Sequence, residues 1–215
     1  MANFELKLKG KTLVLIDWAN VYGWTKSLKK EVDPKALLGY LKTYPEIEKV
    51  NFYYGLDKNQ KSEAFLTDIA DMGYSVVSKE VKYIPIYLDS SHFGKLAREV
   101  KDSLQSIASL KTEDIEKILQ ILSRKVLRRK CDFDMEIALD CFKDMDKYKS
   151  FIFFSGDGDF EPLYRLLGGH KKQVIVIYAP GHLGKEVWDL KRVIFKTEVG
   201  NFPVLKNVPP ISRGA

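Results

Sequence analysis

The sequence predicts a doubly wound α/β fold, in which helices cover both faces of a mostly parallel sheet. Six apolar, β-rich runs of strand length recur along the 215 residues, and helical patterns separate most of them. Strands that alternate with helices form βαβ units, whose strands pair in parallel. Because 45% of the residues are hydrophobic, the chain can also fill one substantial core.

The expected strands are short, and several are apolar throughout, which is typical of a sheet buried on both faces. They begin at Thr12 (TLVLID), Val50 (VNFYYGL), Tyr74 (YSVVSKEV), Phe151 (FIFFSG), Val174 (VIVIYAP) and Arg192 (RVIF). The first two expected helices carry their own start and stop signals. Asp33 can cap the helix in DPKALLGYLKTY, where Pro34 suits the first position, and Gly73 ends the helix in NQKSEAFLTDIADMG.

The alternation is interrupted between about residues 88 and 129. Two mostly polar helical patterns follow each other there, one in SSHFGKLAREVKDSLQSIASL and one in TEDIEKILQILSRKVLRRK. We therefore expect a helical insertion in a domain that spans residues 1–200. Residues 201–215, which contain Pro203, Pro209 and Pro210, are expected to form an extended and poorly ordered tail.

Composition restricts the class of protein. The formal net charge of +6 suits a polyanionic partner. Cys131 and Cys141 show no metal-binding spacing and no disulfide framework, which favours a reducing, cytoplasmic location. The first residues lack the apolar segment of a secretory signal, and no apolar run approaches the roughly 18 to 20 residues that span a bilayer, so we expect no membrane partner.

Acidic residues follow two of the expected strands. Asp17 ends LVLID, and Asp157 and Asp159 follow FIFFSG. Ligands of parallel sheets bind beyond the carboxyl ends of the strands, at the point where the strand order reverses. If these two strands are neighbours, the three carboxylates converge on one crevice. The alternative is that Asp17 binds loop amides and Asp159 caps the helix that follows it.

A fourth acid lies within CDFDMEIALDCFKDM. In a helix, Asp134 falls near the centre of the apolar face, whereas Asp140 points away and is expected to be solvated. Asp134 can instead cap this helix. Together, Asp17, Asp134, Asp157 and Asp159 make an oxygen-only site that suits Mg²⁺ or Mn²⁺. A cation held there would polarise a phosphodiester and lower the pKa of a bound water.

Basic and aromatic residues suggest contacts with a nucleic acid. The run SRKVLRRKCDFD contributes Arg124, Lys125, Arg128, Arg129 and Lys130. They can hold phosphates, or they can simply favour a helix C-terminus and keep the surface soluble. Tyr22 and Trp24 can stack on unpaired bases of a single-stranded RNA, or pack in the core.

Three stretches resemble one known family: LIDWANVYG, CDFDMEIALDCF and FFSGDGDFEPLYRLLGGHKKQVIVIYAP. They are similar to the NYN domain, the LabA-like branch of the PIN-like nuclease superfamily. The resemblance implies a PIN-like α/β/α sandwich and metal-dependent cleavage of RNA. By position, it assigns the site to Asp17, Asn20, Asp134, Ser155, Asp157, Asp159 and Phe160, and Asp189 matches a further common acid. The segment KCDFD departs from the family pattern, because Asp132 replaces a glycine.

The sequence thus predicts a ribonuclease in which Asp17, Asp134, Asp157 and Asp159 bind Mg²⁺ or Mn²⁺. Asn20 and Ser155 are expected to orient water or a carboxylate by hydrogen bonding, and a metal-activated water attacks the phosphodiester. The main alternative is an RNA-binding or adaptor module with little turnover, which engages another protein or a second copy through the insertion. A third reading is an enzyme that acts on small phosphate esters.

Overall fold

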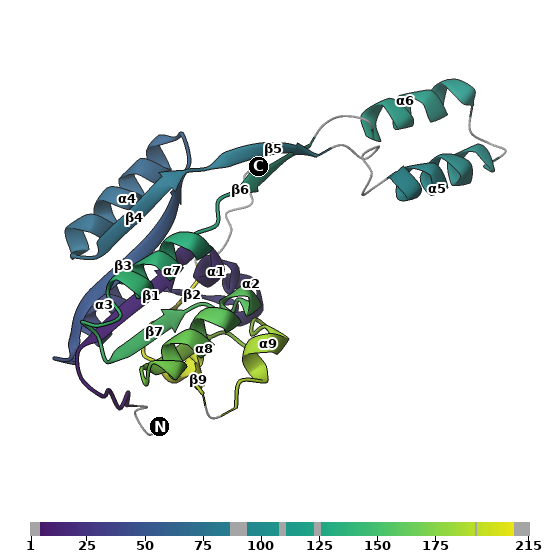
Figure 1. Ribbon diagram of the computed structural model, residues 1–215. Coiled ribbons are helices and arrows are strands. Elements are labelled where there is room, and N and C mark those ends of the chain that lie inside the picture. The colour runs from purple at the N-terminus through teal and green to yellow at the C-terminus, as the bar shows by residue number, and fades with distance from the viewer. Residues whose placement is uncertain (1–4, 87–93, 108–110, 123–125, 192, 209–215) are drawn as a thin grey trace. The chain divides into compact units, whose positions relative to one another are not determined.

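The computed structural model describes residues 5–86, 94–107, 111–122, 126–191 and 193–208 (Figure 1). The chain divides into two compact units. One unit comprises residues 1–80 and 132–215, and the other comprises residues 81–131. The insertion expected at residues 88–129 falls inside the second unit.

The first unit contains a six-stranded sheet in which every neighbouring pair of strands is parallel. In spatial order the strands are β4 (Ser75–Glu80), β3 (Ile47–Leu56), β1 (Thr12–Asp17), β7 (Ser150–Phe154), β8 (Gln173–Tyr178) and β9 (Phe195–Glu198). From β1 the chain builds outward to β3 and β4, and then continues on the other side with β7, β8 and β9. The strand order therefore reverses between β1 and β7, which confirms the predicted doubly wound fold.

Helices connect these strands. They are α1 (Trp18–Gly23), α2 (Thr25–Leu28), α3 (Pro34–Leu41), α4 (Gln60–Met72), α7 (Asp134–Lys143), α8 (Glu161–Gly169) and α9 (Lys185–Trp188). The predicted local signals are confirmed for two of them. Asp33 caps α3 by accepting a hydrogen bond from Lys35 N at 3.0 Å, and Gly73 ends α4 with a left-handed φ of 102°. None of the helices in the described ranges is long and apolar enough to cross a bilayer.

Both faces of the sheet are buried, and β1 shows how. Val14 and Ile16 belong to one core cluster together with apolar residues of α3 and α4. Since side chains alternate along a strand, Leu15 points to the opposite face. There it pairs in register with Phe153 of β7, whose ring packs against Tyr164 of α8 at 4.8 Å. Figure 1 shows α7 and α8 covering that face, which completes the three-layer arrangement.

The expected tail is shorter than the sequence suggested. Phe202 and Val204 are buried, and β10 (Leu205–Asn207) pairs antiparallel with β2 (Lys30–Val32). The boundary predicted at residue 200 was therefore wrong, because the packed structure continues at least to Asn207. Neither short strand is apolar or alternating enough to stand out in the sequence, so only their pairing identifies them. Pro209 and Pro210 lie outside the described residues.

The second unit contains α5 (Gly94–Gln105), α6 (Thr112–Leu122) and the antiparallel pair β5 (Lys82–Ile86) and β6 (Val126–Lys130). The sequence extended the second helix through the basic run to Lys130. In the structure α6 ends at Leu122, and Arg128, Arg129 and Lys130 lie in β6. The reason is that β5 supplies hydrogen-bonding partners to this segment from 40 to 48 residues earlier in the chain.

Replacing Phe202 by Ala tests the corrected boundary. Phe202 is 5% exposed and its ring contacts that of Tyr40 at 5.5 Å, so we expect the free energy of unfolding to fall by about 3–5 kcal/mol in urea titration. The control is Lys206→Ala, which removes surface ion pairs with Glu31 and Asp33 and should cost about 1 kcal/mol or less. Equal, small effects of both changes would mean that the segment is a loose tail.

Candidate metal centre

Asp17 ends β1 and begins the site. Its Oδ1 accepts a hydrogen bond from Asn20 N at 3.3 Å, so the carboxylate caps α1, and the residue is 9% exposed. Along β1, Asp17 alternates with Ile16 and shares the face of Leu15, which α7 and α8 cover. Capping, the expected alternative, is therefore one of its roles. The backbone amide of Ala19 is a second donor to this carboxylate.

The loop after β7, the strand next to β1, carries three more of the predicted residues. Ser155 is buried, and its Oγ accepts a hydrogen bond from Asp157 N at 3.3 Å. Asp157 caps the short 3₁₀ helix η1 (Gly158–Phe160) by accepting from Asp159 N at 3.0 Å. The cap is thus Asp157 and not Asp159, which is exposed.

Gly156 lets this loop approach the loop after β8. A Cβ atom at position 156 would lie 1.5 Å from the carbonyl oxygen of His182, and Gly184 N donates to Gly156 O at 2.7 Å. No other residue fits between these two backbones. The loop that carries Asp157 is therefore held by backbone contact on the side of β8.

Asn20 holds the same loop on the side of β1. Its Oδ1 accepts hydrogen bonds from Trp24 Nε1 at 2.9 Å and from Gly156 N at 3.2 Å. Trp24 is fully buried, so the expectation that it stacks on bases was wrong: its indole positions Asn20 from within the core. Tyr22, in contrast, is 67% exposed and can still contact a ligand.

Asp134 is the first residue of α7. The residue at the cap position is Phe133, and no side chain caps this helix, so Asp134 does not have the capping role that was its alternative. It is half-buried in the first turn, where the helix dipole favours negative charge.

A hydrogen-bonded network fixes α7 on the sheet. Asp140 Oδ2 accepts from Tyr53 OH at 2.7 Å and from Asn51 Nδ2 at 3.1 Å. Asn51 and Tyr53 lie two residues apart on β3 and so share the face of α7. Phe133 packs against the ring of Tyr53 at 5.8 Å. The expectation of a solvated Asp140 was therefore wrong, since this residue anchors the helix that carries Asp134.

The acids act on each other electrostatically. Burial raises the pKa of Asp17 from 3.8 to about 6, and the charges of Asp134 and Asp157 add to the rise, while the amide of Asn20 opposes it. The pKa of Asp134 is also raised, first by burial and then by Asp157, whereas Lys79 lowers it. The charge of Asp157, from the loop after β7, thus disfavours the ionisation of Asp17 on β1 and of Asp134 on α7.

The donor set fits a hard divalent cation in its chemistry, because it consists of carboxylate oxygens. As the side chains stand, no three acidic, histidine or cysteine groups among the described residues are close enough together to hold an ion. Asp17, Asp134 and Asp157 are the residues that interact most, and Asp159 is at the exposed rim.

Three further residues belong to this region and were not expected from the sequence. Tyr164 is completely buried, and its hydroxyl has no hydrogen-bond partner among the described residues. Burial raises the pKa of this hydroxyl, and the charges of Cys141, Asp157 and Asp17 add to the rise. Glu186 Oε2 lies 2.6 Å from where a Cβ atom of Gly158 would be. Lys79 Nζ forms an ion pair with Glu136 Oε1 at 2.5 Å. In the sequence, Tyr164 has the position of an ordinary core residue of its helix. Only its hydroxyl without a hydrogen-bond partner distinguishes it.

The predicted basic residues are only partly described. Arg124 and Lys125 lie outside the described residues. Arg128, Arg129 and Lys130 are exposed on β6 in the second unit.

Comparisons with known proteins agree with this fold. The family model of the NYN domain matches residues 81–194, a range that includes Asp134, Asp157 and Asp159 but not Asp17. The chain is similar to the low amplitude and bright protein LabA of Synechococcus elongatus, with 25% identity over 176 residues, 81% of this chain and 76% of LabA. It is also similar to the crystal structure of a protein of unknown function from Vibrio parahaemolyticus, with a TM-score of 0.59 and 20% identity over 93% of this chain and 99% of that one. At this identity the structural likeness shows the fold alone.

Replacing Asp17 by Asn should stabilise the protein at pH 7 without divalent cations. The folded state binds the Asp17 proton more tightly than the unfolded chain, since its pKa is about 6 instead of 3.8. The tighter binding of this proton stabilises the folded state. The contribution is fully present below about pH 4 and is lost as the pH rises through about 6, where Asp17 of the folded protein ionises. Asn keeps the acceptor that caps α1. We expect a gain on the order of 2–3 kcal/mol at pH 7 and little at pH 4, measured by urea unfolding in EDTA.

The exposed Asp146 provides the control for that measurement. Asp146→Asn removes the same charge from a solvated position and should leave stability within about 0.5 kcal/mol at both pH values. A loss of stability at pH 7 in Asp17→Asn would contradict the burial of an uncompensated carboxylate.

Proposed function

The chain belongs to the NYN-domain family of the PIN-like superfamily, whose members are generally nucleases, and from this premise we propose that it is a metal-dependent ribonuclease. The observation that carries the proposal is that the charges of Asp134 and Asp157 act on Asp17 where the strand order reverses between β1 and β7. Ligands of open parallel sheets bind at this place. A partly buried group of acids there needs positive charge, which a divalent cation supplies.

Asp17, Asp134 and Asp157 would hold Mg²⁺ or Mn²⁺, and Asp159 is available at the rim. When bound, such an ion polarises a phosphodiester and makes water a better nucleophile at neutral pH. Asn20 is held by the two hydrogen bonds to its Oδ1, which aims its Nδ2 donor at a fixed place. Ser155 accepts from Asp157 N through Oγ, so its hydroxyl proton can be donated to a carboxylate. These two residues therefore orient the groups around the reaction.

A second candidate is an RNA-binding or adaptor module without turnover. It is favoured by the absence, among the described residues, of three acids close enough to hold an ion together. In that case α5 and α6 would provide a surface for another protein or a second copy. Cleavage assays separate the two candidates.

Replacing Asp157 by Asn tests the nuclease. Asn retains an oxygen that can cap η1, so the fold should persist, but the negative charge needed to hold the cation is lost. We expect Mn²⁺-dependent cleavage of a labelled single-stranded RNA to fall about a hundredfold or more, the scale of losing one group that stabilises transition-state charge.

Asp146→Asn is the matched control and should cut as fast as the parent protein. Undiminished cleavage by Asp157→Asn would remove Asp157 from the mechanism. If the parent protein binds RNA but releases no fragments with Mg²⁺ or Mn²⁺, the adaptor candidate is the better one. Release of phosphate from small monoesters, with RNA intact, would indicate a different phosphate-ester enzyme.

The β5–β6 ribbon is the part of the second unit best suited to RNA. Residues directly opposite each other share one face of an antiparallel pair. Lys82 lies opposite Lys130, and Ile84 lies opposite Arg128, so one face carries three cations. Tyr83 lies opposite Arg129 on the other face and is 52% exposed. Cations beside an exposed aromatic ring suit a phosphate backbone with unpaired bases.

Two of these charges also lie opposite each other across the ribbon. Like charges directly opposite on paired strands are destabilising, and Lys82 and Lys130 are such a pair. A polyanion across this face relieves the repulsion. We therefore include Lys82 with Arg128, Arg129 and Lys130 as RNA-contacting residues, a role that the sequence did not suggest for Lys82.

The double variant Lys82→Gln, Arg128→Gln should bind single-stranded RNA more weakly and with less dependence on salt. Each lost phosphate contact reduces the slope of log K against log salt by about 0.7. Fluorescence anisotropy at several salt concentrations measures it. Lys61→Gln, on the exposed side of α4, removes one like charge from the first unit and should leave the slope unchanged. An unchanged slope in the double variant would exclude the ribbon from RNA binding.

A further inference from the structure

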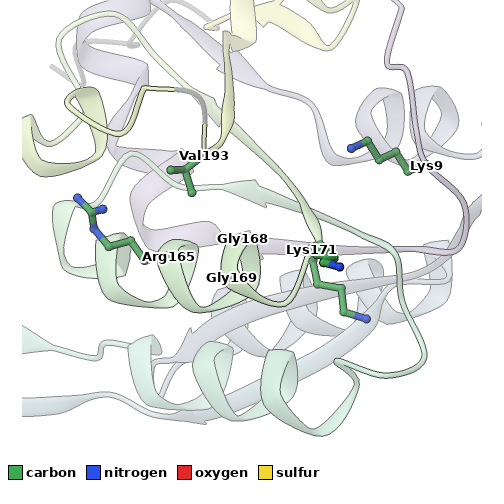
Figure 2. A pocket seen from close by; sticks show the side chains of 7 residues that line it. Lys9, Arg165, Gly168, Gly169, Lys171 and Val193 are labelled. Atoms are coloured by element: carbon green, nitrogen blue, oxygen red, sulfur yellow. The ribbon is translucent and has the colours of Figure 1, made fainter.

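A basic pocket of about 530 Å³ lies on the first unit, away from the acids. It is lined by Lys9, Arg165, Gly168, Gly169, Lys171, Lys172 and Val193. Its size is that of pockets that bind small organic ligands. Figure 2 shows Gly168 and Gly169 on the last turn of α8, between Arg165 on one side and Lys171 on the other.

This pocket is at the amino edge of the sheet. Lys172 immediately precedes β8, and Lys9 N donates to Ser150 Oγ at 3.2 Å and to Gln173 Oε1 at 3.0 Å, at the first residues of β7 and β8. The acids, in contrast, follow the last residues of β1 and β7. The length of a strand, roughly 15–20 Å, separates the two places. The pocket is therefore not part of the candidate metal centre.

The lining carries four cationic side chains and no acid. Arg165 pairs with Glu161 through Nε, which leaves donors of its guanidinium for another acceptor. Lys172 Nζ donates to Tyr148 O at 3.0 Å, a contact that keeps its ammonium group in place. A pocket with three lysines and an arginine is complementary to an anion, and an ammonium or guanidinium recognises phosphate well.

Lys171 occupies a position that favours glycine. Lys172 N donates to Leu167 O at 3.0 Å and Lys171 N donates to Gly168 O at 2.9 Å, the hydrogen bonds of a Schellman motif at the end of α8. Lys171 is the left-handed residue of this motif, with φ 60°. A side chain in that conformation is strained, whereas glycine is not. Lys171→Gly can therefore remove the charge without a cost to the backbone.

The two glycines leave the end of the helix bare. At Gly169 a Cβ atom would meet nothing within 4 Å, so the position opens onto space. At Gly168 it would come 2.8 Å from Cγ1 of Val193. A ligand can therefore enter the pocket beside the last turn, where the cationic side chains would hold an anion, since the carbonyl groups of a helix C-terminus favour cations.

We propose that this pocket is an anion site that binds a phosphate group, supplied either by a free nucleotide or by the RNA chain. The site goes beyond the proposed nuclease activity, because its residues are separate from the aspartates and need no divalent cation.

The test uses the protein in EDTA, which removes any cation from the acidic centre. Inorganic phosphate and uridine 5′-monophosphate are titrated while the ¹⁵N–¹H resonances of Gly168 and Gly169 are followed. Both probes should shift these resonances. In Lys171→Gly the dissociation constant of the nucleotide should rise about fivefold, as expected for losing one unit charge near 4 Å from a phosphate in water. The melting temperature should stay equal or rise, because glycine suits the left-handed backbone.

Lys29→Gly is a matched control. Lys29 is exposed at the end of α2 with φ 51°, so the change removes the same charge and the same kind of backbone strain. It should leave nucleotide binding unchanged. If the resonances do not move with either probe, or if both variants bind the nucleotide as the parent does, the pocket is not a phosphate site.

A last titration distinguishes the two sources of phosphate. If Lys171→Gly also weakens binding of a single-stranded RNA, measured without divalent cations, the pocket holds the RNA chain. If RNA binding stays unchanged while nucleotide binding weakens, the pocket holds a free nucleotide. These binding measurements do not depend on RNA cleavage. Failure of the nuclease proposal would therefore appear only in the cleavage assay, and failure of the phosphate site only in the titrations.

Discussion

Asp17 ends the central strand in a place where burial and the charges of Asp134 and Asp157 all oppose its ionisation, and its pKa rises to about 6. A carboxylate in such a place lowers stability at neutral pH unless donors or a cation compensate it. The amides of Asn20 and Ala19 donate hydrogen bonds to it but do not cancel the rise. The remaining deficit is the physical reason to expect a divalent cation, and the other parts of the site serve to keep the acids together despite their repulsion.

Rigid elements maintain that arrangement. Asp140 binds Asn51 and Tyr53 of β3, so α7 presents Asp134 from a helix that is fastened to the sheet. Gly156 allows backbone-to-backbone packing that holds the loop of Asp157 against its neighbour. Packing and hydrogen bonds outside the site can thus offset the repulsion between the acids.

Charge is distributed unevenly over the molecule. The carboxyl edge of the sheet gathers acids, while the amino edge has the basic pocket and the second unit has the basic β5–β6 ribbon. With a net charge of +6, the protein as a whole attracts a polyanion, although the proposed reaction centre repels one unless a cation is bound. A divalent cation would therefore serve both to stabilise the acids and to let RNA approach them.

The sequence by itself determined the features that depend on local physics. The apolar strands, the Asp33 cap and the Gly73 stop are each encoded within a few residues. Asp17 ends one apolar strand in the sequence and Asp157 follows another, and in a parallel sheet the ends of these strands lie at the same edge. Only the tertiary structure decided the role of Asp140 and the burial of Trp24 and Tyr164, because each depends on residues far away in the chain. The same holds for β6 and β10, which are strands only by virtue of distant partners. Hydrogen bonds between remote segments leave no periodic signal, so a sequence read along its length cannot reveal them.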